Sequence, residues 1–213
     1  MFLVLVLSAL TILAWPSGDQ PKRCVNPGVR REWRSLTLEE RTGFMSAVNC
    51  LSTVSSVWGR NGTIYDDFAE LHGGIGSCYW DWTADWTDLA ASSIWSPETG
   101  FGGDGNHSGP VTVGEGRCVT DGPFADLRPI KYNHTYVTHC LSRGFRERGP
   151  QGQDLRRSFR PESIGKIMRM RTYSDFAHEL EYRLHNSLHY LVSGDFRALT
   201  AANGMYCLSI YFP

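Results

Sequence analysis

The segment 173–203 restricts the fold of this chain most, because its apolar residues and two histidines share one helical periodicity. Four apolar side chains recur every four residues and predict a buried stripe: Phe176, Leu180, Leu184 and Leu188. His185 and His189 have the same spacing, so on a helix both imidazoles leave one face. Gly194 follows the periodic residues and is expected to end the helix. The histidine pair should therefore lie at the edge of the buried face.

Two imidazoles one helical turn apart have two interpretations. Neutral imidazole binds copper, zinc, iron and nickel, so His185 and His189 are candidate ligands of one metal ion. Histidines at the edge of a core also act as ordinary hydrogen-bonding residues, which is the commoner role of an isolated pair. Asn186 stands where a zinc protease of the HExxH type carries its glutamate, and the chain has no GxSxG elbow. These two absences argue against a hydrolase.

Length and charge describe one domain of ordinary size. The chain has 213 residues, of which 21 are basic and 22 are acidic, and it contains no internal repeat. This balance gives no attraction toward nucleic acid or an anionic membrane surface, so neither is an expected partner.

The N-terminal residues of the chain predict that the protein is secreted. Residues 1–14 are an apolar run too short to span a bilayer comfortably, and they sit where a secretory signal peptide belongs, here taken as residues 1–18. A buried N-terminal strand is the alternative. Three Asn-x-Ser/Thr triplets, at Asn61, Asn106 and Asn133, favour a secreted glycoprotein, with no membrane association after signal removal.

The six cysteines suit an extracellular protein with disulfides. None forms a CxxC pair, which excludes zinc ribbons and thioredoxin-type motifs. Sequence alone does not choose among the many possible pairings, but Cys118 and Cys140 flank one loop-rich stretch and are the pair that we predict.

Local patterns place the remaining elements. Helix is predicted over 38–51, where Thr37 and Glu40 form a capping box, over 64–72, and more weakly over 163–171. We also expect an extended arm over 19–31 and a short strand over 135–138. The remaining segments are expected to be loops, Gly/Pro-rich over 96–116 and basic and solvated over 144–160.

Several strings resemble the tyrosinase domain of secreted fungal type-3 copper proteins. In chain order they are REWRSLTLEER, YDDFAELH, YWDWTADWTDLAASSIWSPETGFGG, GRCVTDGPFADL, HCLSRGF and LHNSLHYLVSGD, and they fall within residues 24–203. The resemblance implies a mainly α fold, with long loops around a four-helix-bundle core. It also implies two copper ions, each held by three histidines, and oxidation of phenols and o-diphenols to o-quinones by O₂.

The resemblance assigns three of the histidines. His72 matches the first ligand of the first copper, whereas His185 and His189 match the first two ligands of the second copper. The other four histidines match no ligand: His107, His134, His139 and His178. Phenolic small molecules are the implied substrates.

The family's other three ligand histidines have no counterpart. A Pro-Trp-His-Arg element is missing between His72 and the YWDW string, and a Phe-x-x-His-His element is missing after His189. We therefore expect an incomplete tyrosinase domain over 19–203, with a non-matching tail over 204–213, truncated or mis-spliced and inactive toward phenols. The stripe from Phe176 to Leu188 should then lack part of its cover. The alternative is a non-catalytic secreted glycoprotein that binds at most one metal ion.

Overall fold

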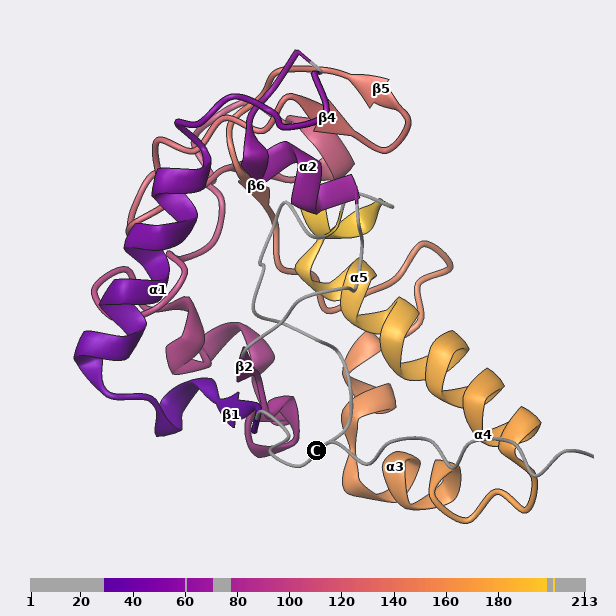
Figure 1. The fold of residues 1–213 in the computed structure, drawn as a ribbon. Coiled ribbons are helices and arrows are strands. Elements are labelled where there is room, and N and C mark those ends of the chain that lie inside the picture. The colour runs from indigo at the N-terminus through magenta and orange to yellow at the C-terminus, as the bar shows by residue number, and fades with distance from the viewer. Residues whose placement is uncertain (1–28, 60, 71–77, 199–200, 202–213) are drawn as a thin grey trace, which may run out of the picture.

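Helices supply most of the regular structure, as Figure 1 shows. The computed structural model describes residues 29–59, 61–70, 78–198 and 201. Its helices are α1 (Leu38–Leu51), α2 (Ile64–Glu70), α3 (Pro161–Ile167), α4 (Tyr173–Glu179) and α5 (Asn186–Val192). The predicted mainly α fold is confirmed. No helix within these ranges is both long enough and apolar enough to cross a bilayer. The predicted signal peptide lies outside them.

Short strands and 3₁₀ turns lie within the loops outside the helices. Each pair of strands forms its own small sheet: β1 (Arg31–Glu32) with β2 (Cys78–Tyr79) in parallel, and β3 (Arg117–Cys118) with β6 (Ser142–Arg143) and β4 (Lys131–Tyr132) with β5 (Thr135–Tyr136) antiparallel. Single 3₁₀ turns punctuate the rest: η1 (Trp33–Ser35), η2 (Trp82–Asp85), η3 (Leu89–Ala91), η4 (Ser93–Trp95), η5 (Val113–Glu115), η6 (Leu155–Phe159) and η8 (Gly194–Arg197). The strand predicted over 135–138 is thus two residues long, and of the predicted arm only residues 29–31 are described.

Helix α1 has the predicted bounds because its start is encoded locally. The Thr37 Oγ1 accepts from the Glu40 N–H at 3.1 Å, and the Thr37 N–H donates to the Glu40 carboxylate at 2.7 Å, which completes the capping box. The helix over 163–171 is predicted less well, since α3 begins at Pro161, a favoured first helical residue, and ends at Ile167. Helix α2 begins at Ile64 as expected, whereas residues 71 and 72 lie outside the described ranges.

The long C-terminal helix runs without interruption from Tyr173 to Val192, but its middle turn, η7 (Leu180–His185), is a π-helix. The prediction that its apolar stripe lacks cover is wrong at Leu184 and Leu188, which are 1% and 0% exposed. Turn η6 packs beside this part of the helix, where the Ser158 and Ser187 hydroxyls lie 2.9 Å apart. Phe176 and Leu180, nearer the start of the helix, are half-buried.

Turn η6 also corrects the predicted solvated loop over 144–160. Leu155 and Phe159 are buried, and the Phe159 ring meets Trp82 edge to face with centroids 5.4 Å apart. These two apolar residues sit among many charges, so the composition of the segment concealed them. Residues 147–153 are mostly exposed, as predicted for a surface loop, whereas η6 contributes Leu155 and Phe159 to the core.

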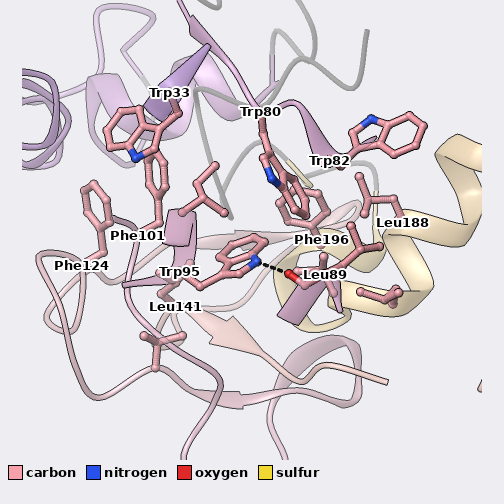
Figure 2. Packing of buried hydrophobic residues seen from close by; sticks show 14 of the residues in the cluster. Trp33, Trp80, Trp82, Leu89, Trp95, Phe101, Phe124, Leu141, Leu188 and Phe196 are labelled. Carbon is pink, nitrogen blue, oxygen red and sulfur yellow. Dashed lines mark hydrogen bonds between the residues drawn. The ribbon is translucent and has the colours of Figure 1, made fainter. Parts of the chain in front are cut away.

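Aromatic side chains pack together within the hydrophobic core, as Figure 2 shows. The Trp80 and Trp95 rings meet edge to face at 5.4 Å, and the Trp95 indole N–H donates to the Leu89 carbonyl at 2.9 Å. Leu188, near the end of the long helix, and Phe196, from η8 beyond it, join the same cluster. The YWDW string and the two His-bearing helical turns therefore share one core.

A disulfide links Cys118 of β3 to Cys140, as predicted. It holds together two chain segments whose strands, β3 and β6, pair directly beside it. Of the other cysteines, Cys50 is exposed and unpaired among the described residues, and Cys24 and Cys207 lie outside them.

Candidate metal centre

The structure brings His185 and His189 together at the edge of the core. Their Nε2 atoms lie 2.6 Å apart and their ring centroids 4.5 Å apart, and both side chains are partly buried. The two nitrogens are hydrogen-bonded to each other, so both rings face one position, as the four-residue spacing predicts. Their role as metal ligands remains a prediction.

The second nitrogen of each ring faces an acceptor, and that of His189 is hydrogen-bonded to it. The Nδ1 of His189 bonds to the backbone carbonyl of Phe196. Because a carbonyl only accepts, this Nδ1 carries the hydrogen and the Nε2 lone pair points toward His185. The His185 Nδ1 lies 3.6 Å from a carboxylate oxygen of Glu181. An outer partner on Nδ1 with Nε2 turned inward is the usual arrangement of a metal-binding histidine. The donor set therefore fits copper or another cation that prefers imidazole.

The π-helical turn η7 ends at His185, and the α-helix resumes at Asn186. A wider turn changes which side chains share a face, and such turns are frequent at functional sites. The apolar spacing gave no indication of it, since a period of four fits an α-helix and a π-helix almost equally well.

A third metal donor is absent from the residues that the structure describes. Within those ranges no three His, Cys, Asp or Glu side chains gather closely enough to hold an ion. His72, predicted to be a ligand of the first copper, falls outside them. Three other histidines are exposed: His107 lies 3.2 Å from Asp104, His178 stacks on Tyr182, and His134 occupies the turn between β4 and β5.

His139 is buried and pairs with Asp195, a contact that sequence reasoning missed. The His139 Nε2 lies 2.8 Å from Asp195 Oδ1, and its Nδ1 lies 2.6 Å from the Val137 carbonyl. Both partners are acceptors, so only the doubly protonated imidazolium satisfies both contacts. Burial lowers the pKa of His139, but the hydrogen bond and charge of Asp195 outweigh it and raise the pKa above its ordinary value.

Comparisons with known proteins assign the family of this chain. The family model described as the common central domain of tyrosinase matches residues 63–204. The chain belongs to the tyrosinase family. This assignment makes it a member of a copper-dependent family, as the six quoted strings indicate.

Two curated relatives are fungal. The chain is 54% identical over 214 residues to a tyrosinase-like protein, phomQ2, of Diaporthe leptostromiformis, covering 85% of this chain and 55% of that one. It is 51% identical over 213 residues to the tyrosinase ustQ of Aspergillus flavus, covering 84% and 60%. The chain therefore spans little more than half the length of these relatives. Because a 214-residue alignment takes in only 85% of the 213 residues here, it opens gaps within this chain.

A solved structure shares the fold. The polyphenol oxidase from Thermothelomyces thermophila superposes with a TM-score of 0.56 at 20% identity, covering 83% of this chain and 65% of that one. At this identity the likeness speaks for the fold alone.

Proposed function

We propose that this chain is a tyrosinase-like copper domain in which His185 and His189 supply two ligands of one copper ion. The observation that carries the proposal is the convergence of their Nε2 atoms, with the His189 Nδ1 bonded to the Phe196 carbonyl. His72 is proposed as a ligand of the other copper, from its match to the family motif. Phenols and o-diphenols are the proposed substrates, and o-quinones the products.

Three of the described residues would position the two histidines for copper or shield them from water. The Phe196 carbonyl keeps the His189 lone pair turned inward, Glu181 lies beside the outer nitrogen of His185, and buried Leu188 keeps water from the inner side of the helix. Copper, when bound, supplies the exchange between Cu(I) and Cu(II) that oxidation by O₂ requires.

We further propose that a polypeptide of these 213 residues holds at most one copper ion and does not oxidise phenols. Two facts support this: the described residues offer no third donor, and the alignments with the relatives open gaps within the chain. Two imidazoles hold an ion loosely, and reduction of O₂ in this family uses two ions. The relatives' activity is therefore not carried over to this polypeptide.

Copper counting tests both proposals. The secreted chain is loaded with Cu(I), desalted, and assayed for copper per chain by mass spectrometry and for oxidation of a catechol. About one weakly held ion and no oxidation are expected, and His185→Ala with His189→Ala should abolish binding. His178→Ala is the matched control, because His178 is an exposed histidine on the same long helix. Two ions per chain with catechol oxidation would contradict the inactivity proposal, and unchanged copper in the double variant would contradict the site.

The second candidate, a non-catalytic secreted glycoprotein, is favoured by the surface. Asn61, Asn106 and Asn133 are all exposed, and the disulfide suits an oxidising compartment. Secretion from a eukaryotic host and a glycosidase-dependent mass shift test this reading, with Asn→Gln variants assigning each glycan. A copper-free, glycosylated, secreted product would favour it over the copper domain, whereas retention in the cytosol without glycans would overturn it.

A further inference from the structure

The contact that orients His189 depends on a sharp turn after α5. The accepting Phe196 carbonyl lies seven residues beyond His189, so the chain must reverse to reach it. Residues 193–195, called the elbow below, make this reversal. Ser193 has φ 56° and ψ −163°, a conformation that L-residues rarely adopt, and Gly194 has φ 60°. A side chain on Gly194 would meet the Ser142 carbonyl oxygen, 2.1 Å from the Cβ position.

Asp195 fastens the elbow to another part of the chain. It is fully buried, and its two carboxylate oxygens accept separately, one from His139 Nε2 and one from the Ser142 N–H, each at 2.8 Å. Both donors belong to the segment that the Cys118–Cys140 disulfide holds against β3. On the other side of Phe196, Arg197 bonds to Glu115 at 2.5 Å and lies over the Tyr190 ring. The contacts of Asp195 and Arg197, the residues on either side of Phe196, therefore fix the position of the Phe196 carbonyl.

We infer that Asp195 and His139 are positioning residues for the metal centre. They hold the elbow in its strained conformation, which places the Phe196 carbonyl on the His189 Nδ1 and keeps the hydrogen on that nitrogen. Without them the imidazole hydrogen distributes between Nδ1 and Nε2, and the Nε2 lone pair is lost to the metal in part of the molecules. The consequence for copper rests on the proposed function, whereas the consequence for the His189 hydrogen does not.

The variant Asp195→Asn tests this inference, because an amide has one accepting oxygen where the carboxylate has two. Ring ¹⁵N chemical shifts of His189 in the metal-free protein report which nitrogen carries the hydrogen, and competition with a chromophoric chelator reports the Cu(I) affinity. We expect a mixed tautomer and an affinity about 10- to 100-fold lower, the usual effect of losing an outer-shell partner. Asp85→Asn is the matched control, since Asp85 also accepts several hydrogen bonds, from Arg34, Trp80 and Ser92, away from the elbow.

A second pair of variants keeps the test decisive if Asp195→Asn does not fold. His139→Gln retains an N–H donor for Asp195 and should preserve the His189 tautomer, whereas His139→Leu removes the donor and should not. A purely structural role for His139 would lower stability without changing the tautomer. Wild-type tautomer and affinity in folded Asp195→Asn or His139→Leu would overturn the inference. If the wild-type chain binds no copper, the proposed function fails. The tautomer comparison then still decides whether Asp195 and His139 fix the hydrogen of His189.

Discussion

At the scale of the residue, Ser193 occupies a backbone conformation that suits glycine. Strain of this kind costs roughly 1–3 kcal/mol, and the buried Ser193 hydroxyl has no hydrogen-bond partner among the described residues. Ser193→Gly removes both the backbone strain and the unpartnered hydroxyl. It also raises the conformational entropy of the unfolded chain, which costs about 0.5–1 kcal/mol of stability. We expect a gain of about 1 kcal/mol in the free energy of unfolding, measured in urea. Ser193→Ala removes only the hydroxyl and should gain less, so an equal gain in the two variants would refute the strain argument.

His139 gives the stability of the protein a pH dependence of known sign. Its folded pKa is raised above 6.5, so the stability from its pairing with Asp195 is complete below that value. This stability is lost as the pH rises through the folded pKa. The neighbouring groups that share its environment are Asp66, whose charge also raises the pKa, and the Tyr132 ring. The free energy of unfolding should fall as the pH rises above about 6.5 in the wild type, and much less in His139→Gln. Parallel profiles would show that another group titrates.

At the scale of the element, turn η6 covers the helix that carries the two histidines. Phe159 is 1% exposed, so Phe159→Ala should cost about 3–5 kcal/mol, the usual range for a buried phenylalanine. Phe176→Ala, on the half-buried start of the long helix, should cost clearly less. Chemical denaturation of the two variants compares them directly. Equal costs would mean that η6 is not a principal part of the core.

The same elements show which parts of the fold can be predicted from the sequence. Helix α1 was predictable because its cap and its apolar spacing are local signals between Thr37 and Leu51. Turn η6 was not, since Leu155 and Phe159 are isolated in a charged segment and gain their burial only from distant partners. The convergence of His185 and His189 follows from spacing within one helix. The His139–Asp195 contact joins residues 56 apart, and no local pattern encodes it.

At the scale of the whole molecule, residues 117–146, which include β3 and β6, contact both α2 and α5. The Ile130 N–H donates to Asp66 of α2 at 3.2 Å, and the Gly144 and Arg146 N–H groups donate to the Val192 and Leu191 carbonyls of α5 at 3.0 and 2.8 Å. The Cys118–Cys140 disulfide closes this segment, so its loss should loosen both attachments together.

We therefore expect the Cys118→Ala, Cys140→Ala double variant to lose about 2–4 kcal/mol in the free energy of unfolding, as for other native disulfides. Because the lost link serves α2 and α5 alike, amide exchange should accelerate at both helices, and most at the carbonyl-bonded Gly144 and Arg146 amides. Cys50→Ala is the control, since Cys50 is exposed and unpaired among the described residues. Faster exchange confined to the residues beside the disulfide would show that the segment does not couple the two helices.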